Sequence, residues 1–251
     1  MSGLQRRAGP AGRFQVGPSG GQGPLLVLLP GIEGDPTVFS ELGGLAADRP
    51  VEAWPLPEGP GLPVDLSVPV LAAALLAGLP AGPVCLLGAS LGGLVAWEAA
   101  HQQPDRVRAL VTLGSLPHPR HRPAGLALSA ALVDRLPRCW VAARYRARIR
   151  ARHAEEGVDP ELSAALLARL PAPVLLARRL RAVASWDPLG PPPVPCLWLR
   201  GQVDTEAPWT TAQAQRELPG VEVQTVPGGH RAMLTHPQAL VAAVRPFLRG
   251  R

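Results

Sequence analysis

The stretch VCLLGASLGG, residues 84–93, decides the fold of this chain. Its first four residues are apolar, which is typical of a strand buried on both faces of a parallel sheet. Glycines then surround Ser90, and the residues from Leu91 to His101 have helical character before Pro104 ends the segment. A strand, a tight turn and a helix therefore follow one another directly, and this order is typical of a βαβ unit.

The same alternation of apolar runs and helical patterns extends over most of the 251 residues. It predicts the α/β class, with a mostly parallel sheet flanked by helices. A chain of this length can bury one sizeable core, so we expect a single domain over residues 1–251. The expected strands cover 13–16, 25–29, 51–56, 84–87, 109–113, 196–199 and 221–226, and the expected helices cover 68–79, 91–101 and 240–248.

One segment, residues 116–186, breaks this alternation, because it contains several helical patterns and no convincing strand. We expect it to be a helical lid inserted over one end of the sheet. Within it, Val141, Tyr145 and Ile149 follow one another at intervals of four residues, so they share one face of a helix.

Ser90 lies at the centre of the pattern G-x-S-x-G, the nucleophile elbow, in which small residues flank a serine on a strained strand-to-helix turn. The alternative is a tight turn with a capping serine. Residues 17–21, GPSGG, match the same pattern around Ser19. That second match lacks a strand before it and a helix after it, so we interpret it as a coincidence of composition.

A nucleophilic serine needs a base, and the base needs a group that orients it. Asp204 follows the strand expected at 196–199, and His230 follows the strand expected at 221–226. Residues just past the carboxyl ends of parallel strands face one crevice, so both are candidates. A turn-forming aspartate is the alternative for Asp204, and Glu206 is its nearest competitor.

The remaining histidines are weaker candidates for the base. His236 stands where the final helix begins, and a helix-capping or surface role fits it better than a catalytic one. The others lie on expected helices or in the insertion, without a strand end nearby. We interpret His101, His118, His121 and His153 as ordinary polar residues, although His118 and His121 could line the mouth of a pocket.

Stabilising the oxyanion of a tetrahedral intermediate needs two backbone N–H groups. Leu91, the residue after the serine, is expected to provide one. Ile32, in the loop that follows the strand at 25–29, is expected to provide the other, since Gly31 and Gly34 let this loop fold tightly. On its own, this loop would be read as a simple glycine-rich turn.

Taken together, these blocks resemble the α/β-hydrolase superfamily from about Gly23 to Leu248. The resemblance implies the fold of that name and a serine hydrolase whose triad runs in the order Ser90, Asp204, His230. In one departure, Pro30 stands where the family usually has the histidine of a His-Gly motif. The matching blocks are LLPG at 28–31, residues 88–93, RVRALV at 106–111, residues 201–204 with Pro208, and GGH at 228–230.

A narrower resemblance concerns residues 30–39, PGIEGDPTVF, which are similar to the oxyanion region of acyl-carrier thioesterases. The first strands are also expected to be short, as in those domains. Such thioesterases often carry their acid after an earlier strand, but no carboxylate stands near Gly114, the matching place in this chain. The resemblance to thioesterases is therefore partial.

We therefore expect a small-molecule carboxylic ester or thioester to be hydrolysed through an acyl-enzyme on Ser90, without a cofactor or a metal ion. Acyl transfer to an alcohol or thiol would use the same triad. Related enzymes with an aspartate nucleophile are disfavoured by Ser90 itself. A catalytically silent binding protein on the same fold is the non-enzyme alternative, because a fold alone does not fix function.

The net charge of +6 comes entirely from arginine, since the chain contains no lysine. Residues 116–186 contain 13 arginines and 5 acidic residues, so the insertion is +8 and the rest of the chain is −2. Arg144, Arg148 and Arg152 recur every four residues and form a stripe on one helix. This stripe could be a solvated face in an arginine-biased chain, or a docking surface for an acidic acyl-carrier protein or an acyl-CoA phosphate.

Other partners and compartments have weaker support. No nucleic-acid-binding motif accompanies the basic charge. The three cysteines, Cys85, Cys139 and Cys196, are far apart and do not suggest disulfides. The N-terminal residues lack the apolar core of a signal peptide, and no apolar run is long enough to span a membrane. We therefore expect a cytoplasmic protein without a membrane span.

Overall fold

The structure is a computed structural model that describes residues 12–18, 21–58, 62–63, 66–115, 137–187, 190–207 and 209–251. Ser19, the centre of the second G-x-S-x-G match, lies outside these residues. His118, His121 and Pro208 also lie outside them, as does the part of the insertion before residue 137.

The described residues form one seven-stranded sheet with the order β1-β3-β2-β4-β5-β6-β7. Strand β1 is antiparallel to β3, and every other neighbouring pair is parallel. Because β4 to β7 are consecutive neighbours, the loops after them line up along one edge of the sheet. The strands are β1 (Phe14–Gln15), β2 (Leu25–Leu29), β3 (Val51–Ala53), β4 (Val84–Ala89), β5 (Val107–Leu113), β6 (Cys196–Gly201) and β7 (Glu222–Val226).

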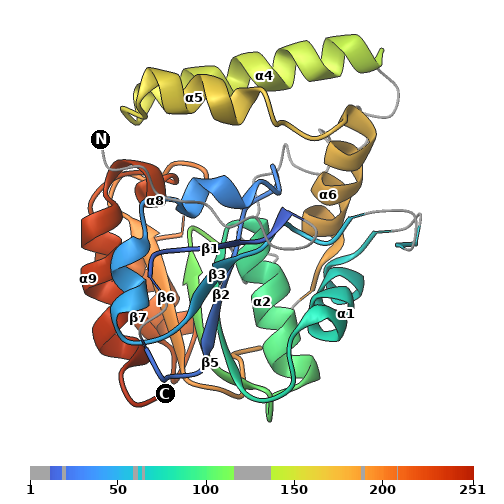
Figure 1. Cartoon of the computed structure of the whole chain (residues 1–251). Helices are drawn as coiled ribbons and strands as arrows, with labels where there is room; N and C mark the ends of the chain where they lie inside the picture. Colours follow the sequence, from blue (N-terminus) through green and yellow to red (C-terminus); the bar gives the residue numbers. More distant parts are fainter. Residues whose placement is uncertain are drawn as a thin grey trace.

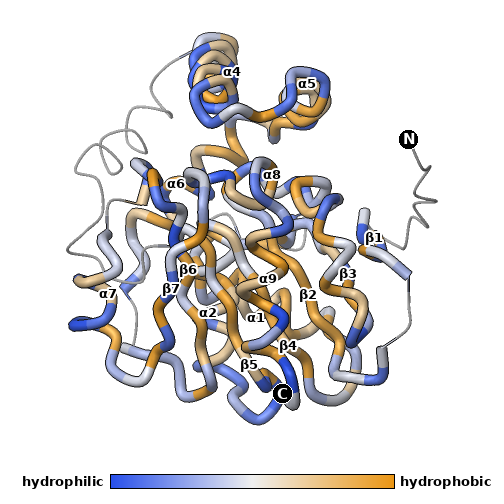
Figure 2. Tube along the Cα trace, turned by 90° about the vertical axis from the view of Figure 1, so that its left-hand side faces the viewer, coloured by the Kyte–Doolittle hydropathy of each residue, from blue (hydrophilic) through white to orange (hydrophobic). Residues whose placement is uncertain are grey.

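Two apolar cores lie on opposite faces of this sheet, as the alternation of β-strand side chains requires. Val84 and Leu86 of β4 belong to one core, whereas Cys85 and Leu87 belong to the other. The orange, apolar strands run through the middle of the molecule in Figure 2. The first core is covered by α1 (Val68–Gly78), α2 (Leu91–Gln102) and α7 (Thr211–Glu217), and the second by η2 (Pro36–Phe39), η3 (Gly43–Ala47), α8 (Ala232–Thr235) and α9 (Pro237–Leu248).

This architecture confirms the predicted α/β class and the mostly parallel sheet flanked by helices. The bounds differ from the prediction at β3, which ends at Ala53 instead of Leu56. Pro55 and Pro57 follow, and proline has no N–H with which to continue a ladder of hydrogen bonds. Strand β4 is longer than predicted and extends to Ala89, immediately before Ser90.

The described part of the insertion consists of three helices, α4 (Arg138–Glu155), α5 (Pro160–Leu167) and α6 (Pro173–Ser185). Helices α4 and α5 lie side by side across the top of the molecule in Figure 1, beyond the ends of the strands, and α6 descends towards the sheet. Whether these helices act as a lid remains a prediction. Among the described helices, none is long and apolar enough to cross a membrane.

Candidate active site

Ser90 occupies the turn between β4 and α2 in a strained backbone conformation. Its φ is 51°, and among the described residues it is the sole non-glycine with a positive φ. Two hydrogen bonds hold the turn: the Ser90 N–H donates to the Leu113 carbonyl over 2.8 Å, and the Ser115 hydroxyl donates to the Ser90 carbonyl over 2.8 Å. Strain held by neighbouring bonds in this way is a feature of functional turns.

The glycines around Ser90 are required by close backbone contacts. A Cβ on Gly88 would lie 2.2 Å from the Gly92 carbonyl oxygen, and one on Gly92 would lie 2.3 Å from the Leu29 carbonyl oxygen. A Cβ on Gly93 would collide with the Ser115 hydroxyl at 1.9 Å. The crowding that motivated the sequence motif is therefore present in the folded chain.

His230 and Asp204 meet because β6 and β7 are neighbours in the sheet. The imidazole Nδ1 of His230 lies 3.0 Å from Asp204 Oδ2. The other oxygen of this carboxylate, Oδ1, accepts the backbone N–H groups of Glu206 at 2.8 Å and Ala207 at 2.9 Å. Asp204 is 2% exposed, so its orientation is fixed by these three bonds.

This pairing determines the charge of both groups. Burial alone would raise the pKa of Asp204, but the hydrogen bond from His230, the charge of that residue and the two backbone donors outweigh it and lower the pKa. Burial alone would lower the pKa of His230, whereas the bond to Asp204 and the Asp204 charge raise it. An ionised carboxylate thus faces an imidazole with increased basicity.

The alternative candidates for the acid and the base, Glu206 and His236, make other contacts. Glu206 binds the Arg231 guanidinium at 2.6 Å, and no hydrogen bond joins it to His230 among the described residues. Arg231 also binds Glu156 at 2.7 Å, which ties the end of α4 to the loop of His230. His236 is exposed at the start of α9, and its side chain makes no capping bond, so it is a surface residue.

The expected oxyanion loop packs directly against Ser90. A Cβ on Gly31 would lie 3.4 Å from Ser90 Cβ. The Gly34 N–H donates to the Gly31 carbonyl over 2.9 Å, which closes a tight turn with Ile32 at its centre. Leu91 begins helix α2, so its N–H lies at the positive end of the helix dipole. Leu91 and the turn that contains Ile32 therefore both lie next to Ser90.

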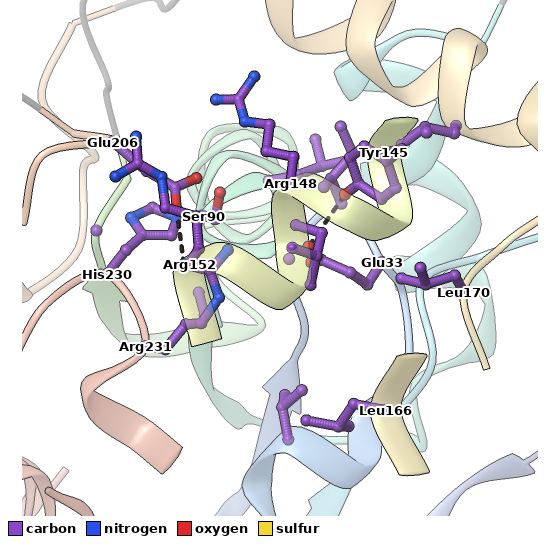
Figure 3. A pocket seen from close by; sticks show the side chains of 18 of the residues that line it. Glu33, Ser90, Tyr145, Arg148, Arg152, Leu166, Leu170, Glu206, His230 and Arg231 are labelled. Atoms are coloured by element: carbon purple, nitrogen blue, oxygen red, sulfur yellow. Dashed lines mark hydrogen bonds and ion pairs between the residues drawn. The ribbon is translucent and has the colours of Figure 1, made fainter. Parts of the chain in front are cut away.

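Ser90 and His230 open into a cavity of about 550 Å³ beneath the insertion. Part of its lining is aliphatic and part is charged. Figure 3 shows Leu166 and Leu170 on the opposite side of the view from His230 and Glu206. The arginines predicted to form a stripe on α4 line this cavity. The aliphatic lining includes Leu94, Leu166, Leu170, Leu176, Leu180 and Val183, and the charged lining includes Arg144, Arg148, Arg152, Glu206 and Arg231.

Several residues at the site were not predicted from the sequence. The Tyr145 hydroxyl donates to Glu33 Oε1 over 3.0 Å, and burial together with the Glu33 charge raises its pKa. His153, predicted to be an ordinary polar residue, is buried in the cavity wall with Nδ1 2.8 Å from Ser163 Oγ. Arg179 contacts the oxyanion loop from α6, and its spacing from Leu176 offered a sequence signal for an inward-facing position.

No group of three potential ligands among His, Cys, Asp and Glu gathers within the described ranges.

The strand order, the strained serine turn and the His230–Asp204 pair define a known class of protein. The chain belongs to the alpha/beta hydrolase family, whose model matches residues 26–244. Solved structures with the same fold include a thermophilic esterase from Thermogutta terrifontis, with 22% identity, a TM-score of 0.73 and coverage of 98% of both chains. An enol-lactonase from Burkholderia xenovorans has 19% identity, a TM-score of 0.74 and coverage of 94% of this chain and 95% of its own.

Relatives found by sequence similarity match shorter stretches of the chain. A pimeloyl-[acyl-carrier protein] methyl ester esterase from Shewanella woodyi is 38% identical over 98 residues, which is 39% of this chain and 38% of that protein. The protein named carbamate hydrolase RutD from Variovorax paradoxus is 31% identical over 180 residues, or 67% of each chain. The chain thus spans about two fifths of the length of the esterases that it matches.

Proposed function

We propose that the protein hydrolyses a carboxylic ester or thioester through an acyl-enzyme on Ser90. The observation that carries this proposal is the 3.0 Å contact between His230 Nδ1 and Asp204 Oδ2 at the edge of the cavity that Ser90 lines. A nucleophile, a base and a group that orients the base are the minimum set for this chemistry. The names of the esterase relatives agree with it.

The first half of the reaction forms the acyl-enzyme. His230 Nε2 accepts the proton of the Ser90 hydroxyl while Oγ attacks the substrate carbonyl carbon. The N–H groups of Ile32 and Leu91 donate to the oxyanion that develops. His230 then gives its proton to the leaving oxygen or sulfur, the bond to the leaving group breaks, and the acyl group stays on Ser90. Asp204 orients the imidazole and stabilises its charged form throughout.

The second half releases the acid. A water molecule loses a proton to His230 Nε2 and attacks the acyl carbonyl carbon through its oxygen. The tetrahedral intermediate collapses, the bond to Ser90 Oγ breaks, and the proton on His230 returns to the serine oxygen. The products are the free carboxylic acid and the enzyme in its starting state, so the steps balance without an external oxidant or reductant.

The two kinds of cavity lining suggest where each half of the substrate binds. The aliphatic side, which includes Leu166 and Leu170, suits an acyl chain, because each buried methylene contributes about 0.8 kcal/mol. The arginines of α4 suit an anionic leaving group, such as the phosphate of a carrier-linked or coenzyme A thioester. An acyl-carrier substrate is therefore the second candidate. The name of the pimeloyl-[acyl-carrier protein] relatives also places a carrier protein on the substrate, but the bond that it names is a methyl ester and not the carrier thioester.

The proposal is tested with a panel of p-nitrophenyl esters and acyl thioesters of graded chain length. We expect hydrolysis by the wild-type chain, with kcat/KM rising up to about fourfold per methylene until the cavity is filled. Ser90→Ala should lower kcat by about 10⁴–10⁶-fold. Activity that persists in Ser90→Ala would contradict the mechanism. Product analysis with an added alcohol or thiol separates hydrolysis from acyl transfer.

The carrier-linked alternative has its own test. Arg144, Arg148 and Arg152 changed together to glutamine should lower kcat/KM for carrier-linked thioesters, and added salt should do the same to the wild-type chain. Small neutral esters serve as the control, because a charged stripe does not steer them. Equal effects on both kinds of substrate would contradict a docking role for the stripe.

A further inference from the structure

Arg179 is the most deeply buried arginine among the described residues, with 1% of its surface exposed. It follows Leu176 by three residues and precedes Val183 by four, so it shares one face of α6 with these cavity-lining residues. Transferring a guanidinium from water to such a place costs several kcal/mol unless hydrogen bonds and charges compensate it. The contacts of this side chain therefore need an explanation beyond packing.

Those contacts are with the oxyanion loop. Arg179 Nη1 donates to the Ile32 carbonyl oxygen over 3.0 Å. The guanidinium also lies against Gly34, where a Cβ would be 2.3 Å from Nη1 and 2.6 Å from Nη2. Gly34 has φ +76°, so both its conformation and this close approach require glycine. The loop and the arginine are thus complementary to each other.

A carboxylate from the segment after β3 balances the charge of Arg179. Its Nη2 lies 3.3 Å from Oε2 of Glu58. The Glu58 side chain is 57% exposed, so the guanidinium is the buried member of this ion pair. A planar guanidinium can bind the carbonyl and the carboxylate at once, whereas a lysine ammonium is a compact point charge. The arrangement connects helix α6, the turn at residues 31–34 and the segment after β3.

We propose that Arg179 is a positioning residue for the oxyanion hole. By holding the Ile32 carbonyl, it fixes the peptide plane that follows Ile32, and the bond from the Gly34 N–H holds the Gly31 carbonyl, which shares a peptide plane with the Ile32 N–H. Together the two bonds set the direction of the Ile32 N–H towards the substrate oxygen. Donors of this kind act only if they are held in place before the charge develops. The inference rests on the proposed function and deepens it, since it makes the geometry of the oxyanion hole depend on helix α6 of the insertion.

The experiment compares Arg179→Met and Arg179→Lys with Arg181→Met, a matched control at an exposed position of the same helix. Each protein is titrated with a fluorophosphonate, so that kcat is expressed per reactive serine and misfolded molecules are not counted. We expect Arg179→Met to lower kcat about 10–100-fold with KM changed less than threefold. Arg179→Lys should recover part of the loss, and Arg181→Met should stay within twofold of wild type.

A second readout separates positioning from general stability. An alkylboronic acid adds to a serine oxygen and mimics the tetrahedral intermediate, so its inhibition constant should rise in Arg179→Met by a factor similar to the loss in kcat. An unchanged kcat per titrated serine, an unchanged inhibition constant, or an equal loss in Arg181→Met would overturn the inference. A wild-type chain that neither reacts with the fluorophosphonate nor hydrolyses esters would instead contradict the proposed function.

Discussion

Replacing Asp204 by asparagine should change the tautomer of the His230 imidazole while preserving the fold. Oδ1 accepts the N–H groups of Glu206 and Ala207, so the amide oxygen of the asparagine must take this place. The amide NH₂ then points at His230 Nδ1, where Oδ2 now lies at 3.0 Å. Two donors cannot face each other, so Nδ1 becomes an acceptor and the proton moves to Nε2. An imidazole in this tautomer cannot take the proton of Ser90.

The expected loss in kcat for Asp204→Asn is about 10²–10⁴-fold, which corresponds to about 3–5 kcal/mol of transition-state stabilisation. The pH profile should change as well. Hydrolysis requires neutral His230, so activity rises with pH through the pKa of that residue, which Asp204 raises above 6.5. Burial lowers this pKa, and the largest contributions that raise it come from Asp204, with a smaller one from Glu206. Removing the Asp204 carboxylate should therefore lower the pKa, and the acid limb of kcat/KM should move to lower pH.

The assay is hydrolysis of a p-nitrophenyl ester from pH 5 to 9, with thermal unfolding recorded for each variant. Glu206→Gln is the matched control, because Glu206 binds Arg231 instead of His230, and its loss should stay below about tenfold. The reasoning is refuted if Asp204→Asn keeps more than a tenth of wild-type kcat, or if Glu206→Gln is the more damaging change.

Three further predictions follow from the same contacts. His230→Ala should be nearly as damaging to kcat as Ser90→Ala, whereas the exposed His236→Ala should cost less than tenfold, and comparable losses would leave the base unassigned. Gly114 has φ +59°, and a Cβ there would be 3.0 Å from both Asp204 Oδ2 and His230 Nδ1. Gly114→Ala should therefore destabilise the fold by about 1–2 kcal/mol and lower kcat at least tenfold, as measured by urea unfolding and ester hydrolysis, and a wild-type kcat would contradict this. Burial, together with the Arg231 charge, lowers the pKa of His153 to about 4 in the folded chain, from an ordinary value of 6.5. As pH drops from 6.5 towards 4, the unfolded chain therefore binds a proton before the folded chain does, and the free energy of unfolding should fall. In urea unfolding, His153→Gln should reduce the loss of stability between pH 7 and pH 4.5 by up to about 2 kcal/mol. The same pH dependence in the variant and the wild-type chain would contradict this assignment to His153.

The sheet and the positions of Ser90, Asp204 and His230 could be predicted because the signals are local. Apolar runs mark strands that are buried on both faces, and parallel strands bring their carboxyl ends to one edge. The glycines beside Ser90 reflect crowding within a few residues of it. The bounds of β3 were less accurate, because Val51–Leu56 continues the apolar pattern, while Pro55 and the following Pro57 cannot donate to the ladder of hydrogen bonds.

The contacts between the insertion and the catalytic loops could not be predicted, because they join residues that are far apart in the sequence. The bond from Arg179 to Ile32 spans 147 residues, and that from Tyr145 to Glu33 spans 112. Helical periodicity shows which residues share a face but not what that face meets. For this reason the arginines of α4 could be grouped as a stripe, whereas their place in the cavity wall required the folded chain.

The measurement that tests the central claim most directly is covalent labelling of the wild-type chain with a fluorophosphonate, followed by peptide mapping in a mass spectrometer. The mechanism predicts one label, on Ser90, and no label in Ser90→Ala. Ser115 is an internal control, since it lies beside Ser90 and its hydroxyl donates to the Ser90 carbonyl instead of facing a base. A label on Ser19 or Ser115, or an esterase activity without any label on Ser90, would contradict the assignment of the nucleophile.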